Sequence, residues 1–586
     1  MREKMPAFGQ ASSFKPLFLL LLLTCAAFAN ILTHDFCGDD HTVIVRNTFY
    51  SSLSNLPRLF TRSYFTVGNT AIFKDEPDKG SGSVAYRPVL SLTYFMDHAF
   101  WGKNPFGYHL TNLLLHLANV ALVYFFLSSF FRNQLVVFWA ALLFAIHPVQ
   151  SEAVTSVGFR ADPLAAFWCL LAVCTWLLYQ REQKIRYRNL SLVFFVLALL
   201  TKESSFLLFV WIACMEHLHG ASARNIMRRV MPFFLLAAGY LVVYFVLLPN
   251  TALGNDIMHG LSFSRRLSAL SQIWFNYFLF FVWPPAVKPL PGLYYPFPAP
   301  IFLTLEFWLL LFVLGAGLFL VWRRSTRDEP YMFMLLWFFI FFLPACGLAG
   351  NPNPAGLRYL YLPGVGIYCC LAGGIARLMR SSFALRLTVY WPRFLGTAII
   401  SCCLIFLVFN TMIWRNNMSM GRFWVDELPD FYKGHYIYAN ELYVRGAYLE
   451  AIEHYQEALK DPRADRMMLL NYFARTCLSV GKFEAARALF EELVKLAPGY
   501  ASGYEGLARY YFSQKNFDKC RQYLRQSVGI EPTKDNYLLL MDLAVATKDQ
   551  LALLKTIDEI PVAFASNPPY RDFLLEAARQ RLGEFE

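Results

Sequence analysis

YHLTNLLLHLANVALVYFFLSSF, residues 108–130, decides the fold, because this long run contains no Asp, Glu, Lys or Arg. A helix needs roughly 20 mostly apolar residues to cross a bilayer. Runs of about this kind recur along the chain at 16–33, 108–130, 135–150, 163–179, 189–202, 204–217, 230–249, 267–287, 301–322, 331–349, 358–376 and 394–413. The sequence therefore predicts an all-α fold built on a polytopic bundle of membrane helices.

The composition supports the same expectation. The chain has 586 residues, of which 56% are hydrophobic, 17% aromatic and 16% charged, and its mean hydropathy is +0.38. A soluble globular protein has about 25% charged residues, and aromatic side chains are enriched at membrane interfaces. A soluble enzyme, a fibrous protein and a disordered scaffold are therefore excluded as classes.

The net charge of +12 does not indicate a nucleic-acid partner, because the basic residues cluster at the ends of apolar runs. Lys184, Arg186 and Arg188 form one such cluster, and positive charge beside membrane helices marks the cytoplasmic side. The 12 cysteines form no Cys-x-x-Cys pair, and cysteines inside apolar runs behave as small hydrophobic residues. We expect no nucleic acid, no disulfide framework, no metal and no cofactor.

The placement of basic residues also predicts the topology. With the N-terminus inside, the basic loops 180–188 and 218–229 fall inside as well. The loops that fall outside are 34–107, 151–162 and 250–266. We expect the first run to be a retained anchor, with a cleaved signal peptide ending near Ala27-Phe28-Ala29 as the alternative.

The segment 267–287 breaks the strict alternation of sides. If it crossed the membrane, Arg323, Arg324 and Arg327 would fall outside, against the positive-inside rule. We therefore expect it to be re-entrant or interfacial, which leaves about eleven crossings. The C-terminal part of the chain is then outside the cytoplasm.

The C-terminal part is predicted to be a helical repeat. Hydropathy falls near residue 425, and a period of roughly 34 residues follows, which is the length of a tetratricopeptide repeat. The first copy has Gly446, Ala451, Tyr455 and Ala458, and the second has Gly481, Ala486, Phe490 and Leu493. We expect a membrane domain at 1–424 and a repeat domain at 425–586, with repeats at 432–465, 467–500 and 501–534 and capping helices from 535–555. Such α-solenoids bind polypeptides along a concave surface.

Two adjacent carboxylates, Asp39 and Asp40, follow the first apolar run. Two carboxylates at a membrane surface repel each other, so one can hold a raised pKa and act as a base. The competing interpretation is a helix cap or a solvated turn. Between the two carboxylates, Asp40 is favoured.

A polar stripe follows the membrane helix quoted above. His109, Asn112, His116 and Asn119 lie within an arc of about 80° at 100° per residue, and such a stripe faces a cavity or a neighbouring helix. Hydrogen bonds between helices explain His116 and Asn119. His109 and Asn112, near the outer end, are the functional candidates.

Basic residues and carboxylates gather at the outer ends of the spans. The basic members are Arg87, Arg160, Lys202 and Arg358, and the other candidates there are His147, Glu152, Asp162, Glu203 and Tyr359. Outer loops are not normally enriched in Lys and Arg, so the cluster indicates a bound anion such as a lipid-linked phosphate. Alternatively, Arg160 and Lys202 neutralise their neighbours Asp162 and Glu203.

The order of these motifs resembles a known family. The motifs are Gly38-Asp39-Asp40, Tyr86-Arg87-Pro88, His109-Leu110-Thr111-Asn112, Phe144-Ala145-Ile146-His147-Pro148-Val149 with Glu152-Ala153-Val154, Arg160-Ala161-Asp162, Thr201-Lys202-Glu203 and Arg358-Tyr359-Leu360-Tyr361-Leu362-Pro363. The chain is similar to the transmembrane and tetratricopeptide-repeat protein O-mannosyltransferases, and more broadly to the GT-C glycosyltransferases. The three repeats and His41 after the acidic pair depart from the animal members, and the compact build resembles a bacterial one.

The resemblance implies a membrane glycosyltransferase. It implies that a polyprenyl-phosphate sugar, mannose or another hexose, is the donor and that a Ser/Thr hydroxyl of an extracytoplasmic protein is the acceptor. Asp40 or Asp39 would deprotonate the hydroxyl, which attacks the anomeric carbon with inversion. The four basic residues would hold the departing phosphate without a metal. The repeats would present the protein acceptor or dock a partner.

Other functions remain open at this point. One is a GT-C transferase for a lipid or a cell-surface polysaccharide, and another is a flippase or ligase of whole glycans. The last is a non-catalytic repeat scaffold of an envelope or export complex. We expect the chain in a bacterial plasma membrane with the repeats extracytoplasmic, or alternatively in an endoplasmic reticulum membrane with the repeats lumenal.

Overall fold

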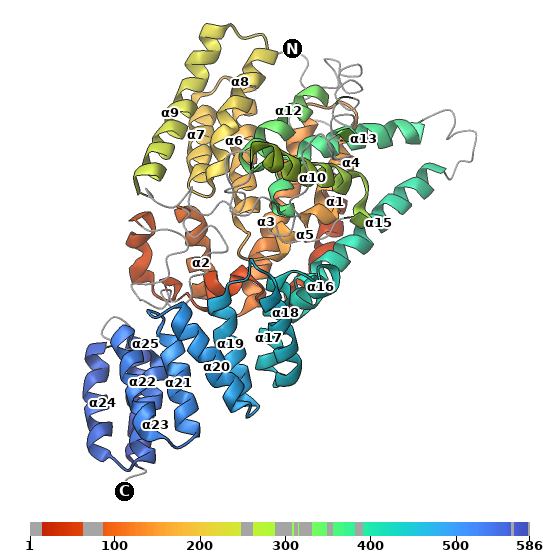
Figure 1. Cartoon of the computed structure of the whole chain (residues 1–586). Helices are drawn as coiled ribbons and strands as arrows, with labels where there is room; N and C mark the ends of the chain where they lie inside the picture. The colour runs from red at the N-terminus through yellow and green to blue at the C-terminus, as the bar shows by residue number, and fades with distance from the viewer. Residues whose placement is uncertain are drawn as a thin grey trace. The chain divides into compact units, whose positions relative to one another are not determined.

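The computed structural model describes the parts of the chain that carry the predicted site and the predicted repeats. These parts are residues 14–47, 49–61, 86–247, 262–286, 308–309, 315, 331–347, 355–380, 391–563 and 568–583. Every regular element within them is helical (Figure 1). The all-α fold class is therefore confirmed for the described residues.

The chain divides into two compact units, the first ending at Asn416 and the second continuing from Asn417. The main helices of the first unit are α1 (Phe14–Phe28), α2 (Pro88–Trp101), α3 (Pro105–Ser128), α4 (Gln134–Ile146), α5 (Ser151–Thr155), α6 (Ala161–Glu182), α7 (Ile185–Leu199), α8 (Leu208–Leu218), α9 (Ala223–Leu247), α10 (Phe263–Val282), α12 (Tyr331–Phe342), α13 (Gly364–Arg380) and α15 (Trp391–Ile413). Short helical turns join them at η1 (Ala29–Thr33), η2 (His41–Val45), η6 (Pro148–Gln150), η7 (Glu203–Leu207) and η11 (Leu357–Leu360).

Five described helices are long and apolar enough to cross a membrane. They span Lys15–Thr33, Pro105–Ser128, Ala161–Glu182, Ala223–Tyr244 and Phe394–Ile413, and a sixth span arises if α4 and the following segment, bent by 46°, count as one. The helix α10, expected to be re-entrant or interfacial, is not among the five. Several apolar helices thus make this a multi-pass membrane unit, while the number of crossings stays a prediction.

The packing of the first unit follows from its all-round apolar helices, which bury each other. Figure 1 shows α6 to α9 side by side in yellow, and α3 packs against both α4 and α6. Fully buried aromatic rings fill the interior, with the Trp337 ring 4.9 Å from Phe126 and 5.1 Å from Trp211. This packing fixes the ends of α3, α4 and α6, which carry the predicted site.

Two features of the first unit differ from the sequence analysis or lie beyond it. The expected loop 34–107 contains the helix α2, which begins at Pro88, a residue well suited to the first turn of a helix. Almost all of the predicted span 301–322 and the basic residues Arg323, Arg324 and Arg327 lie outside the described residues.

The second unit consists of antiparallel helix pairs. Its helices are α16 (Asn417–Glu427), α17 (Tyr432–Val444), α18 (Tyr448–Lys460), α19 (Arg466–Ser479), α20 (Phe483–Leu496), α21 (Ala501–Ser513), α22 (Phe517–Ile530), α23 (Lys534–Ala546), α24 (Gln550–Ala563) and α25 (Pro568–Leu582). The unit begins earlier than the expected residue 425, because α16 packs on α17 and the rings of Trp424 and Phe431 lie 5.8 Å apart.

The turns inside the helix pairs reveal a fourth repeat. Gly446 and Gly481, two residues before the second helix of their pairs, have φ of +80° and +76°. Lys515 and Lys548 hold the same place in the next two pairs, with φ of +57° and +52°. Where capping helices were expected, α23 and α24 therefore form a fourth pair, which α25 follows.

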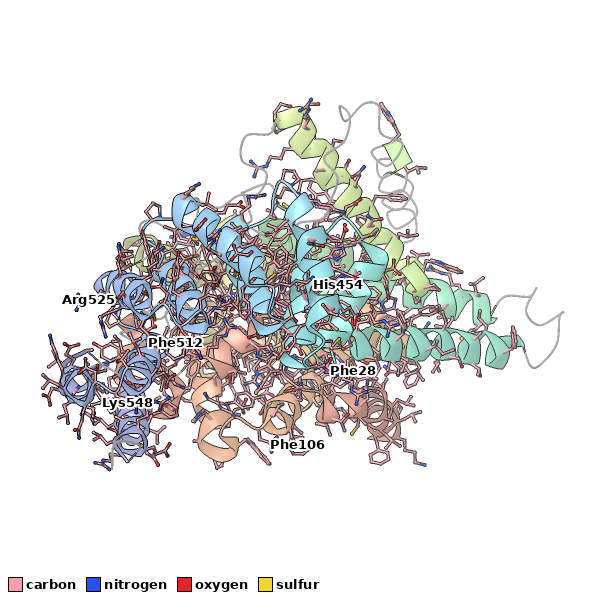
Figure 2. The ribbon with its side chains drawn as sticks, turned by 60° about the horizontal axis from the view of Figure 1, so that its bottom comes forward. Phe28, Phe106, His454, Phe512, Arg525 and Lys548 are labelled. Carbon is pink, nitrogen blue, oxygen red and sulfur yellow. The ribbon has the colours of Figure 1, made fainter. Side chains whose placement is uncertain are left out.

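The repeated apolar positions lie between the helices of the array. Ala451, Tyr455, Ala486 and Phe490 are fully buried, as expected of small and large residues that alternate where helices cross. In Figure 2, the labelled side chains of this unit come from its successive helices and turns, with His454 on α18, Phe512 on α21 and Arg525 on α22.

Candidate functional site

The acidic pair lies in the turn that follows the first span. One carboxylate oxygen of Asp40, Oδ1, accepts hydrogen bonds from the backbone N–H of Gly158 at 2.6 Å and from the Ser156 hydroxyl at 3.2 Å. The other oxygen accepts the backbone N–H of Cys37 at 3.2 Å. Asp40 is fully buried, whereas Asp39 is partly exposed. Asp40 therefore ties the acidic turn to the segment between α5 and α6.

Burial sets the protonation of Asp40. Removal from water raises the pKa of its carboxyl to about 6, against the backbone hydrogen bonds from Gly158 and Cys37, which favour the charged form. The neighbouring charge of Asp39 adds to the rise. A carboxyl with such a pKa beside a second carboxylate is typical of sites that move protons.

The raised pKa predicts that Asp40→Asn stabilises the fold at neutral pH. The usual pKa of 3.8 of the Asp40 carboxyl becomes about 6 on folding. Between these two values the carboxyl ionises more readily in the unfolded chain, so the folded state loses stability as the pH rises. The wild type should lose about 2 kcal/mol of stability relative to the variant between pH 4 and pH 7. Thermal unfolding of the purified chain across this pH range measures the difference. The exposed Asp35→Asn is the control, and an unchanged profile in Asp40→Asn would contradict the burial argument.

Gly158 leaves room for the acidic pair. A Cβ atom at this position would lie 3.2 Å from Asp40 Oδ1 and 3.3 Å from the Cβ of Asp39. We predict that Gly158→Ala displaces both carboxyls by a few tenths of an ångström and lowers about tenfold the kcat of any reaction that depends on them. Gly239→Ala on α9 is the control, since its Cβ would meet nothing within 4 Å. Equal rates in the two variants would show that the close approach is unimportant.

Arg160 is fully buried, and its guanidinium is surrounded by protein groups. It lies 2.6 Å from the carboxylate of Asp97 in an ion pair. It also donates to the Asn112 side chain at 2.6 Å, to the Tyr108 carbonyl at 2.9 Å and to the Thr93 hydroxyl at 3.1 Å. These contacts join α2, α3 and α6 at one point.

The next two cations also pair with carboxylates. Arg87 donates from Nη2 and Nε to the two oxygens of Glu203, at 2.8 and 3.3 Å. Although burial opposes its ionisation, Glu203 has a pKa lowered to about 2 by Arg87. Lys202 lies 2.5 Å from Asp162. The alternative that Arg160 and Lys202 pair with Asp162 and Glu203 beside them is therefore wrong, because each reaches a more distant carboxylate.

Arg358 completes the set of ion pairs. It pairs with Glu152, whose second oxygen accepts the backbone N–H of Leu357 at 2.6 Å. The guanidinium also lies over the rings of Phe159, at 4.0 Å, and Tyr359, at 4.6 Å. Such contacts hold a guanidinium in one orientation.

Three of the four ion pairs are contiguous. The Lys202 ammonium lies 5.3 Å from the centre of the Tyr359 ring, which Arg358 also contacts, and Glu203 follows Lys202 in the chain. Arg87, Lys202 and Arg358 keep 16%, 10% and 11% of their side chains exposed, whereas Arg160 keeps none. An incoming anion can therefore reach the first three most directly.

The polar stripe of α3 contacts the same region. Asn112 donates to the carbonyls of Val154 at 3.1 Å and Ser156 at 3.2 Å. The His109 Nε2 lies 3.4 Å from the Asp35 carbonyl. Deeper in the helix, His116 and Asn119 both reach the Tyr361 hydroxyl, at 2.7 and 3.1 Å, as expected of hydrogen bonds between helices.

His147 lies at the bend between α4 and α5. Its Nδ1 accepts the backbone N–H of Val149 at 3.4 Å, and its ring lies 5.3 Å from that of Tyr368. In the part of the chain that the structure describes, no three His, Cys, Asp or Glu residues are grouped as a metal site requires.

Four residues of this site, Asp97, Ser156, Gly158 and Phe159, were not among those predicted from the sequence. Asp97 could have been noticed, because it is the one acidic residue in the sequence of α2. Ser156, Gly158 and Phe159 gave no signal, since a serine, a glycine and a phenylalanine in a short loop are ordinary there.

Comparison with known proteins identifies the relatives of this chain. A protein from Caenorhabditis elegans, named protein O-mannosyl-transferase F38B6.6, is 28% identical over 239 residues, which is 40% of this chain and 32% of that protein. The human protein O-mannosyl-transferase TMTC1 is 32% identical over 166 residues, or 28% of this chain and 18% of that one. The relatives that this chain matches are named as protein O-mannosyl-transferases. The mouse O-mannosyl-transferase TMTC2 is 33% identical over 156 residues, covering 26% and 18% of the two chains.

The similarity to these O-mannosyl-transferases is partial. The matched segments span about a third or less of the relatives' own lengths, 32% for the worm protein and 18% for the two mammalian ones. Separately, residues 478–543 match the model of a tetratricopeptide repeat, which confirms the predicted repeat type in the C-terminal part.

One solved structure is also similar. The oligosaccharyltransferase of Archaeoglobus fulgidus, tethered to an acceptor peptide, aligns with a TM-score of 0.37 at 15% sequence identity, over 69% of this chain and 54% of that one.

Proposed function

We propose that this protein is a membrane glycosyltransferase that moves a hexose, mannose in the first instance, from a polyprenyl-phosphate donor to a Ser/Thr hydroxyl of an extracytoplasmic protein. The observation that carries the proposal is a buried acidic turn held beside a group of cations at the ends of membrane helices. The O-mannosyl-transferase relatives support the sugar and the protein acceptor.

The acidic pair supplies the base in this proposal. Asp39 is partly exposed and meets the acceptor hydroxyl, whereas Asp40 is buried and has both oxygens engaged by Gly158, Ser156 and Cys37. Asp40 therefore positions the turn and holds negative charge behind Asp39. Because Asp40 is buried, we assign the contact with the acceptor hydroxyl to Asp39 instead of Asp40, which was favoured from the sequence.

The reaction is a single displacement. Asp39 accepts the hydroxyl proton while the oxygen attacks the anomeric carbon, and the bond to the lipid phosphate breaks on the opposite face. The configuration at the anomeric carbon inverts as a result. General base catalysis of this kind typically contributes about 10²- to 10⁴-fold.

The cations stabilise the phosphate as it leaves. Arg87, Lys202 and Arg358 keep part of their side chains exposed, so they can contact the lipid phosphate, which carries one negative charge in the donor and gains a second as its bond to the sugar breaks. Preorganised cations in a site of low water content stabilise such charge far better than water does. Arg160 instead supports Asn112 and α3, and neither a metal nor another cofactor takes part.

In this proposal the repeats bind the protein acceptor or a partner of it. An array of helix pairs offers a surface for an extended polypeptide, and we propose that it presents the protein acceptor or a partner that carries it. The membrane is a bacterial plasma membrane or an endoplasmic reticulum membrane, with the site and the repeats on the side away from the cytoplasm.

Glycan mass spectrometry of extracytoplasmic proteins tests the function. Cells lacking the native gene are supplied with the wild-type chain, with Asp39→Asn, or with a chain truncated after Asn416. We expect a hexose on Ser/Thr peptides with the wild type and its loss with Asp39→Asn. Unchanged protein glycans together with altered lipid-linked glycans would point instead to a transferase for lipids or polysaccharides.

A further inference from the structure

Buried polar atoms without partners gather where the outer ends of α1, α3, α5 and α15 meet. They are Asn30 Oδ1, His34 Nδ1 and Nε2, His109 Nδ1, Thr155 Oγ1 and Trp414 Nε1. Among the described residues, none of these six atoms has a hydrogen-bond partner at ordinary distances and angles, and the His109 ring also lies against the Thr155 backbone. We call these five residues the polar cluster. Leaving such atoms unsatisfied costs free energy, so a native site normally supplies partners for them.

Ring contacts and hydrogen bonds hold the polar cluster together. The His34 and His109 rings lie 6.1 Å apart. The Asn30 amide donates to Thr411 on α15 at 2.8 Å. The backbone N–H of Asp35 donates to the Arg415 carbonyl at 2.9 Å, which brings the end of α15 and Trp414 beside His34.

The polar cluster borders the acidic turn and the cations. Thr155 precedes Ser156, whose hydroxyl donates to Asp40. The Trp414 ring lies 5.8 Å from that of Phe159, and the Arg358 guanidinium lies 4.0 Å from the same Phe159 ring. A ligand with its phosphate at Arg358 would therefore have its next atoms near Trp414.

The chemistry of the polar cluster fits neutral hydroxyls. Burial, with His109 and Arg415 nearby, lowers the pKa of His34 to about 4, so this imidazole is neutral and offers one donor and one acceptor. The Trp414 Nε1–H is a donor, the Asn30 oxygen an acceptor and the Thr155 hydroxyl both. A sugar presents several hydroxyls that both donate and accept, which matches this mixture.

We propose that the polar cluster is the subsite that binds the sugar hydroxyls of the donor, while the cations bind its phosphate. The inference rests on the proposed function and adds to it the residues that recognise the sugar. Trp414 and His34 were not predicted from the sequence. They would then determine how much more tightly the sugar-bearing lipid binds than the same lipid without the sugar.

Equilibrium binding to the purified full-length chain in lipid nanodiscs tests the subsite. The probes are a short-chain polyprenyl phosphate carrying mannose and the same lipid without the sugar. The wild type should bind the mannose-bearing lipid more tightly. Trp414→Phe, which keeps a ring against Phe159, and His34→Leu should each reduce that preference about five- to tenfold, the value of one hydrogen bond, with unchanged affinity for the bare lipid.

Trp176→Phe is the matched control. Trp176 also has a buried Nε1 without a partner in the described residues, but it lies about four turns along α6 from Arg160 and packs against Phe233. Trp176→Phe should leave the preference for the mannose-bearing lipid unchanged.

The outcomes separate the subsite from the function. A wild type without preference for the sugar-bearing lipid, or variants that keep it in full, would overturn the subsite even if transfer is observed. A preference that both variants reduce, in a wild type that transfers no sugar to protein, would support the subsite and count against the proposed protein transferase.

Discussion

Asp39→Asn should lower the rate of sugar transfer by about 10²- to 10⁴-fold, since it removes the base that meets the acceptor hydroxyl. The side chain keeps its size, so the KM for the lipid donor should change little. Asp40→Asn should cost less, about tenfold, because the amide oxygen still accepts the Gly158 N–H, although the variant loses the negative charge and the hydrogen bond from the Cys37 N–H. Initial rates with a mannosyl polyprenyl-phosphate donor and a Ser/Thr peptide measure both effects.

The pH profile separates the two carboxylates. Asp40 has a pKa of about 6, so the wild-type rate should fall as the pH drops through that value and Asp40 becomes neutral. This fall in rate on the acid side of the profile should be missing in Asp40→Asn. If Asp39→Asn is near normal and Asp40→Asn is inactive, Asp40 touches the acceptor. If both variants transfer normally, the base lies outside the pair.

Asp97→Ala should destabilise the first unit by about 3–5 kcal/mol, the usual cost of breaking a buried ion pair from one side. Arg160 would keep its charge with no exposed atom, and Thr111 would lose the carboxylate that accepts its hydroxyl at 2.7 Å. The unfolding midpoint of the purified chain in detergent measures the loss.

A matched control and a rescue accompany this prediction. Glu182→Ala removes the carboxylate of the exposed pair with Lys184 and should leave the stability almost unchanged, since exposed ion pairs contribute little. The double variant Asp97→Leu with Arg160→Met should recover much of the loss, since no charge is left buried. An unfolding midpoint of Asp97→Ala equal to that of Glu182→Ala would mean that the pair contributes nothing to the fold.

The helices were predictable because their signal is local. The run 108–130 reads as a membrane helix from its own composition, and α3 is found there as Pro105–Ser128. The repeats were equally visible through the period of Ala451 and Ala486. The fourth repeat was missed because Leu553 stands where the earlier copies have the small residues Ala451, Ala486 and Cys520, and only the φ of +52° at Lys548 shows the shared turn geometry.

The candidate site was predictable in its residue types but not in its pairings. Adjacent opposite charges suggested pairs within Arg160-Ala161-Asp162 and Lys202-Glu203. The chain instead joins Lys202 to Asp162 and Arg358 to Glu152, because helix packing decides which charged groups are buried together. The partners of Asp40 were hidden for the same reason, since Gly158 reaches it only once α6 packs on α3.

Each of the four cations is paired with its own carboxylate, which has a consequence for selectivity. Without a ligand these groups cancel in charge, so the site attracts free inorganic phosphate or nucleotides only weakly. A phosphate gains full access to Lys202 or Arg358 by competing with Asp162 or Glu152 for the same protons. A ligand that brings further binding energy through an acyl chain in the bilayer can meet that cost, whereas a small soluble anion has no comparable source. The ion pairs would thus act as a filter that admits membrane-borne phosphates in preference to those dissolved in water.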